Sequence, residues 1–94
     1  MLEFKHVDGS QPINIKLFTL STCGWCKKTK ALFKELGVGY DYVDVDLIEQ
    51  DKQQEAREEM KKWNADCSFP TLVINENKCI IGFKEDEIRD QVGK

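Results

Sequence analysis

The segment "INIKLFTLSTCGWCKKTKALFKELG", residues 13–37, decides the fold because its hydrophobic period changes at a pair of cysteines. Its first eight residues are rich in β-branched and aromatic side chains and predict a largely buried strand. After Cys23 the apolar residues recur at helical spacing. The segment therefore predicts a strand, a turn that carries Cys23 and Cys26, and an amphipathic helix.

The predicted helix has an apolar stripe, a cationic side and a glycine-rich end. The stripe consists of Thr29, Leu32, Phe33 and Leu36. The other positions include Lys27, Lys28, Lys30 and Lys34. Gly37 and Gly39 are expected to close the helix, because glycine accepts the left-handed conformation common at helix ends.

The rest of the chain alternates between strand and helix patterns. Strands are predicted at 40–47, 69–74 and 78–83, and helices at 49–64 and 84–92. Residues 1–7 predict a short edge strand, and the turn at 75–77 predicts an antiparallel hairpin. The order β-α-β-α-β-β-α predicts an α/β fold with a four-stranded mixed sheet and helices on both faces. We expect one domain over residues 1–94, with an extension at 1–12 and a core at 13–92.

Composition narrows the class of protein. The chain has 94 residues, a formal net charge of -3 and a pI near 5.1. Such an acidic domain is not expected to bind nucleic acid or anionic membranes, which favour clustered cations. The first nine residues lack the apolar region of an export signal, and no apolar run approaches the roughly 18 residues that span a bilayer. We therefore expect a soluble, cytoplasmic protein.

The cysteine pair admits three interpretations: a metal site, a structural brace or a redox centre. A structural zinc site needs four ligands, and the other candidates are Cys67, Cys79 and His6. Cys79 lies within the last predicted strand, whereas Cys67 precedes its hairpin partner. At ~3.3 Å per strand residue they are not expected to meet, which also opposes a disulfide between them. With no export signal, the close pair is expected to be catalytic or metal-binding and not a structural brace. Because the other candidate ligands are not expected to converge, no metal site is predicted.

Redox chemistry fits the placement of the pair. Cysteines three residues apart at a helix start face the same side, with Cβ atoms roughly 5–6 Å apart, so a small adjustment allows a disulfide. Cys23 would stand at the helix N-terminus, where free N–H groups and the dipole favour a thiolate. Lys27 and Lys28 are candidate cations for that sulfur, with a solvated helix face as the alternative. A cysteine protease is not expected, because no histidine lies on an element that would supply a base.

These features resemble the glutaredoxin branch of the thioredoxin fold. The resemblance is carried by "IKLFTLSTC", "CGWC", the order of elements, "SFPT" and "IIGFKEDEI", and it covers residues 13–92. It implies a thioredoxin-like fold and dithiol–disulfide oxidoreductase activity, with Cys23 as nucleophile and Cys26 as the resolving cysteine. It also implies a cis bond before Pro70, which presents the backbone of Phe69 to an extended substrate.

The pattern departs from glutathione-dependent glutaredoxins, which have "CPYC", a lysine shortly before it and a late "GGxDD"-like segment. Here Leu20 stands three residues before Cys23, and the late segment is "GFKEDE". "SFP" followed by "GF" and a basic residue is more similar to NrdH-type redoxins. Those proteins resemble glutaredoxins but take electrons from a flavin-linked disulfide reductase and pass them to ribonucleotide reductase. Glutathione stays an alternative reductant. Glu85 and Asp86 are either ligands for its amine or acids that stabilise the N-terminus of a helix.

Residues around the pair are predicted to contact a partner or to support the thiolate. Substrate contact is predicted for Trp25, Phe69, Pro70, Gly82 and Phe83. Support of the thiolate or partner contact is predicted for Thr22, Gly24 and Lys27. Cys67 is either a third thiol near Cys23 or a small buried residue, and Cys79 is expected in the core.

Two rival classes stay open. The "CGWC" motif also resembles glutaredoxins that hold a [2Fe–2S] cluster between two subunits, which would use Cys23 of both copies and two external thiols. A structural interaction domain with an incidental cysteine pair is the second rival. The favoured interpretation is a monomeric carrier with no tightly bound cofactor. Its Cys23 and Cys26 thiols would reduce protein disulfides, and the Cys23–Cys26 disulfide that results would be reopened by an upstream reductase or by glutathione.

Overall fold

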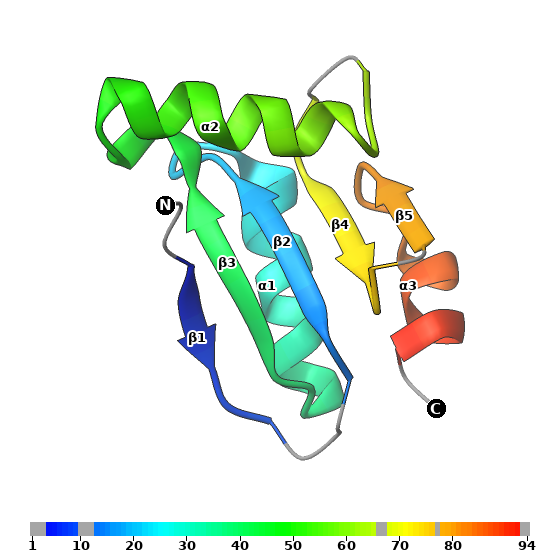
Figure 1. Ribbon diagram of the computed structural model, residues 1–94. Coiled ribbons are helices and arrows are strands. Elements are labelled where there is room, and N and C mark those ends of the chain that lie inside the picture. Colours follow the sequence, from blue (N-terminus) through cyan, green and yellow to red (C-terminus); the bar gives the residue numbers. More distant parts are fainter. Residues whose placement is uncertain (1–3, 10–12, 66–67, 77, 93–94) are drawn as a thin grey trace.

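The computed structural model describes residues 4–9, 13–65, 68–76 and 78–92. Five strands form one mixed sheet in the order β1-β3-β2-β4-β5 (Figure 1). The strands are β1 (Lys5–Val7), β2 (Ile15–Thr19), β3 (Tyr40–Asp44), β4 (Thr71–Ile74) and β5 (Lys78–Ile81). The helices are α1 (Gly24–Leu36), α2 (Gln50–Lys61) and α3 (Glu85–Val92), with a 3-10 turn η1 (Val45–Leu47) after β3. The predicted order of elements is confirmed, including the additional edge strand.

The sheet is arranged around β2. This strand pairs parallel with β3 and antiparallel with β4. The outer strands are both antiparallel to their neighbours, β1 to β3 and β5 to β4. Helix α1 is the crossover of the predicted βαβ unit, so the cysteine turn lies where the parallel strands end.

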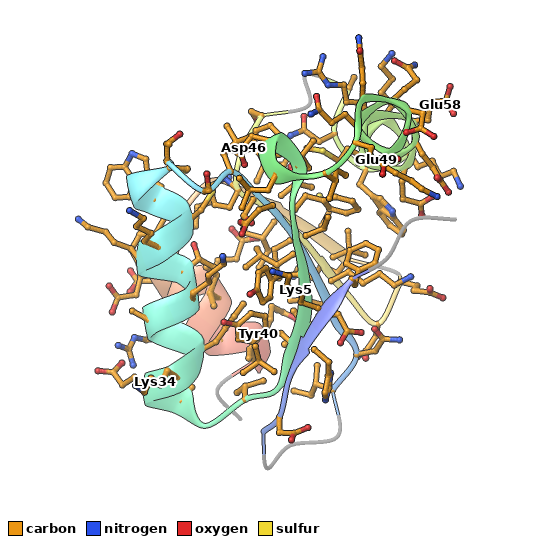
Figure 2. All side chains as sticks on the ribbon, turned by 90° about the vertical axis from the view of Figure 1, so that its left-hand side faces the viewer. Lys5, Lys34, Tyr40, Asp46, Glu49 and Glu58 are labelled. Atoms are coloured by element: carbon orange, nitrogen blue, oxygen red, sulfur yellow. The ribbon has the colours of Figure 1, made fainter. Side chains whose placement is uncertain are left out.

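Neighbouring residues of β2 point to opposite faces of the sheet and divide the core in two. Leu17 belongs to a cluster with Phe33 of α1 and Ile88 of α3. Phe18 belongs to a second cluster with Met60 of α2. All five side chains are buried. The two figures accordingly show α1 and α3 on one face of the sheet and α2 on the other (Figures 1 and 2).

The two glycines after α1 have different roles. Gly37 adopts a left-handed conformation (φ 70°), and its N–H donates to two carbonyls of the last helical turn, as the sequence predicts. Gly39 is not part of that cap. A Cβ atom at Gly39 would lie 2.7 Å from the backbone nitrogen of Gly9, so glycine here allows the chain after β1 to approach.

Several predicted boundaries differ from the structure. The strand predicted at 40–47 ends at Asp44 and continues as η1. The strand predicted at 78–83 ends at Ile81, because Gly82 takes a positive φ of 82° and turns the chain toward α3. Cys79, which was expected in the core, is only half-buried because β5 is an edge strand. Within the described residues, no helix has the length and apolar character that crossing a membrane requires.

Candidate active site

The turn between β2 and α1 is held by a carboxylate that follows β3. The backbone N–H of Ser21 donates to Asp46 Oδ1 at 2.8 Å, and the Ser21 hydroxyl donates to Oδ2. The hydroxyl bond first, and the backbone bond second, hold the pKa of the Asp46 carboxyl below its ordinary value. The N–H of Cys23 donates to the Leu20 carbonyl at 3.1 Å and closes the turn. The Ser21–Asp46 contact was not predicted, although the alternating acids of "VDVD" at 43–46 were a signal for it.

Cys23 and Cys26 lie in unequal environments. Cys23 is the N-cap of α1 and is partly exposed, and the Cys26 N–H donates to its sulfur at 3.2 Å. A helix N-terminus with such a donor favours an anionic sulfur. Cys26 is only 1% exposed, and burial, followed by a hydrogen bond with Cys23, raises the pKa of its thiol to about 12. The pair therefore combines an accessible thiol with a protected one.

A buried polar network holds the segment before β4. Asn64 Nδ2 donates to Ser68 Oγ at 2.9 Å and to Thr71 Oγ1 at 3.2 Å. The Thr71 hydroxyl in turn donates to the Ser68 carbonyl at 2.6 Å. Asn64 and Thr71 are both buried, so these bonds replace the water that their polar atoms lose on folding. This network was not predicted from the sequence.

The Phe69–Pro70 peptide bond is cis, as the family resemblance implies. Thr71 begins β4 opposite Phe18, near the end of β2, so Pro70 lies at the same edge of the sheet as the cysteine turn. The Pro70 carbonyl accepts a hydrogen bond from the Gly82 N–H at 2.9 Å. The structure thus brings two predicted substrate-contact residues, Pro70 and Gly82, together at this edge.

Trp25 and Phe83 form an aromatic platform beside the cysteines. Their ring centroids lie 5.8 Å apart, with the planes inclined by 24°. Trp25 is 56% exposed, and Lys28 Nζ lies 4.7 Å from the centroid of its ring. The indole therefore covers Phe83 and still presents much of its surface to a partner.

Lys30 lies one helical turn after Cys26 and faces β3. Its Nζ is 3.2 Å from Asp44 Oδ1 and 4.0 Å from the centroid of the Tyr42 ring. The Lys30 and Asp44 side chains are 26% and 14% exposed, and the Thr19 hydroxyl donates to the same carboxylate. This contact was not predicted, because the periodicity grouped Lys30 with the cationic side of the helix.

Three further predicted residues are neighbours of the cysteine pair along the chain. Thr22, Gly24 and Lys27 are exposed, and the Lys27 backbone N–H donates to the Cys23 carbonyl at 3.1 Å. Cys67, predicted as a possible third thiol, lies outside the described residues. The part of the chain that the structure describes contains no group of three or more histidine, cysteine or acidic residues suited to a metal ion.

A cysteine pair at the start of the helix in a βαβ unit, on a mixed sheet with helices on both faces, defines a redox protein of the thioredoxin fold. The sequence profile of the glutaredoxin family matches residues 15–79. The chain therefore belongs to the glutaredoxin family, whose general activity is thiol–disulfide exchange.

Three relatives support this assignment. The chain is 36% identical, over 85% of its length and 99% of the relative's, to an uncharacterized glutaredoxin-like 8.6 kDa protein in the rubredoxin operon of Clostridium pasteurianum. Its sequence is 48% identical to that of a glutaredoxin from Methanosarcina mazei. The crystal structure of that protein matches this fold with a TM-score of 0.87, over 97% of this chain and 88% of that one. The chain is also 46% identical to methanoredoxin of Methanosarcina acetivorans, with a TM-score of 0.82, covering 86% and 85% of the two chains.

Proposed function

We propose that the protein reduces disulfides in partner proteins through its own Cys23–Cys26 pair. The observation that carries the proposal is the unequal pair itself. Cys23 is accessible and accepts an N–H at the helix start, whereas Cys26 is buried on the same helical turn. Thiol–disulfide exchange needs such an accessible attacking sulfur with a second thiol in reach.

The proposed reaction has two exchanges. The Cys23 thiolate attacks a partner disulfide, forms a mixed disulfide and releases one partner sulfur as a thiolate. Cys26 then attacks Cys23, which releases the second partner sulfur and leaves the Cys23–Cys26 disulfide. An external reductant returns two electrons and reopens the disulfide.

We propose that the partner protein binds at the edge of the sheet that carries Pro70 and the aromatic platform. Exposed Trp25, stacked on Phe83, offers apolar surface next to the nucleophile. The backbone of Phe69 is proposed to pair with an extended partner segment, as in strand addition. Exposed Thr22, Gly24 and Lys27 would flank that segment.

We propose that the reductant is a flavin-linked disulfide reductase instead of glutathione, and that ribonucleotide reductase is a candidate acceptor. Leu20 occupies the position of the glutathione-binding lysine and packs against the cluster around Phe18. The Glu85 carboxylate is bound by Arg89 Nε at 2.8 Å, which reduces its capacity to hold a γ-glutamyl amine. We further propose that the protein acts in the cytoplasm.

The test compares the reduction of insulin disulfides by the unchanged protein and by single serine variants. Cys23→Ser should abolish turnover, and Cys26→Ser should accumulate a mixed disulfide that mass spectrometry detects. Cys79→Ser is the matched control, since Cys79 lies on β5, away from the helix start, and it should keep full activity. Full activity in Cys23→Ser would refute the proposal.

Two further measurements test the donor and the cofactor. Turnover with a flavin-dependent disulfide reductase should exceed turnover with glutathione and glutathione reductase. Anaerobically purified protein should be colourless and monomeric. Visible absorption together with a dimer would instead support a bridging [2Fe–2S] cluster held by two Cys23 thiolates.

A further inference from the structure

The resolving step requires Cys26 in its thiolate form, whereas the surroundings of Cys26 favour the neutral thiol. Burial raises the pKa of this thiol, and the hydrogen bond and negative charge of Cys23 raise it further. When Cys23 is in a mixed disulfide, its sulfur has no charge, so both of its contributions fall away. Burial then still raises the pKa of the Cys26 thiol, while a backbone hydrogen bond from Leu20 and the positive charge of Lys30 lower it.

We propose that Lys30 is the positioning residue of the resolving step, because its ammonium, fixed by Asp44, stabilises the Cys26 thiolate as that thiolate forms. Lys30 follows Cys26 by four residues, so both side chains lie on the same side of α1. The inference rests on the exchange reaction proposed above. It adds a residue outside the "CGWC" motif that governs only the second exchange.

The ammonium is fixed from the sheet side. The Asp44 carboxylate is 3.2 Å away, and the Tyr42 ring centroid is 4.0 Å away. The Thr19 hydroxyl donates to Asp44 and fixes that carboxylate in turn. The positive charge of Lys30 also contributes to lowering the pKa of the Asp46 carboxyl, in the turn η1 that follows β3. Tyr40 of β3 and Asp8, which follows β1, line the same pocket as Lys30. The contacts with Asp44 and Tyr42 hold the Lys30 ammonium, whose side chain is 26% exposed, against the sheet.

The second exchange conserves atoms and electrons. The Cys26 thiol releases its proton to water, and the thiolate attacks Cys23 Sγ. A Cys23–Cys26 bond forms, and the bond between Cys23 and the partner sulfur breaks. The partner sulfur leaves with the electron pair and takes up a proton from water. Lys30 exchanges no proton or electron, and its charge lowers the free energy of the anionic intermediate.

The experiment separates the two exchanges with one equivalent of 5,5′-dithiobis(2-nitrobenzoic acid) in stopped flow. Attack by Cys23 releases the first nitrothiobenzoate at a rate that depends on protein concentration. Attack by Cys26 releases the second at a rate that does not. The variants are Lys30→Met, which keeps the apolar stem, Lys30→Arg, which keeps the charge, and Lys34→Met. The last is a matched control, since Lys34 lies at the far end of α1 (Figure 2).

Lys30→Met should slow the second phase by about 3- to 10-fold between pH 6 and 9. This follows because loss of the positive charge raises the pKa of the Cys26 thiol and so lowers the fraction present as thiolate, while the more basic sulfur regains part of that loss as nucleophilicity. Lys30→Arg should stay within about twofold of the unchanged protein, Lys34→Met should match it, and the first phase should stay constant throughout. A second phase in Lys30→Met within twofold of the unchanged protein over this pH range would overturn the inference. Absence of a second equivalent from the unchanged protein would instead refute the exchange function.

Discussion

The indole of Trp25 stacks on the ring of Phe83, with the centroids 5.8 Å apart and the planes at 24°. The two residues are far apart in the sequence, and their contact joins the "CGWC" motif to the turn between β5 and α3. An aromatic pair of this kind contributes about 0.5–1.5 kcal/mol beyond the burial of its area. Phe83 therefore orients the exposed indole that we propose as the partner contact.

Phe83→Ala should weaken partner binding without changing the chemistry at Cys23. The freed indole samples more orientations, so KM for a protein disulfide should rise by about 2- to 10-fold, equivalent to the same ~0.5–1.5 kcal/mol. Steady-state kinetics with insulin measures KM, and iodoacetamide alkylation of Cys23 measures the intrinsic reactivity, which should not change. Phe4→Ala is the control, because Phe4 packs edge-on against Phe18 on the opposite face from α1. An equal rise of KM in both variants would contradict the orienting role.

The Ser21–Asp46 contact makes the active-site turn sensitive to acid. The folded-state pKa of Asp46 lies below its ordinary value of 3.8, so its stabilising contribution is complete above that value. It is lost as the pH falls through the folded-state pKa. Asp46→Asn should therefore lower the urea midpoint at pH 7, and its difference from the unchanged protein should shrink below about pH 4. Asp51→Asn, at the exposed first turn of α2, is the control. A difference that stays constant from pH 7 to pH 2 would argue against the ionic contact.

Features set by neighbouring residues could be predicted from the sequence, whereas contacts between residues far apart in the chain could not. The 13–37 segment predicted β2, the turn and α1 correctly, because hydrophobic period and glycine placement are local signals. The contacts made by Asp46, by Lys30 and by Phe83 cross between elements, and their geometry depends on sheet register. A single sequence carries register only through strand alternation, so it could not pair Lys30 with Asp44. The half-buried state of Cys79 was missed for a related reason, since an apolar run does not reveal that its strand is at an edge.

His6 ties β1 to β3 in a pH-dependent manner. Its Nδ1 lies 2.6 Å from Asp41 Oδ1, and its Nε2 lies 2.9 Å from Asp8 Oδ1. The hydrogen bond to Asp41, above all, raises the pKa of the imidazole from 6.5. The contribution of the charged ring is therefore complete below pH 6.5 and is lost as the pH rises through the folded-state value. Amide hydrogen exchange in β1 should show easier opening of this strand at pH 8.5 than at pH 6, after correction for the intrinsic exchange rate.

The control for this edge contact is His6→Gln, which cannot carry the charge. In that variant the corrected protection of β1 should be the same at both pH values. His6 is the sole histidine of the chain, so one imidazole signal in an NMR titration reports its pKa directly. A titration midpoint at or below 6.5 in the unchanged protein would contradict the paired geometry.

Ile88 anchors α3 in the cluster that also contains Phe33 and Leu17, and its side chain is fully buried. Ile88→Val removes one methylene group and should lower the free energy of unfolding by about 0.5–1.5 kcal/mol, because the packed cluster cannot close the cavity completely. Ile81→Val is the matched control, since Ile81 is 38% exposed at the end of β5 and should lose less than about 0.5 kcal/mol. Urea unfolding followed by far-UV circular dichroism measures both changes. Equal losses in the two variants would show that α3 is not held by this contact, and Phe83, which lies two residues before the helix, would then lack a fixed support for its contact with Trp25.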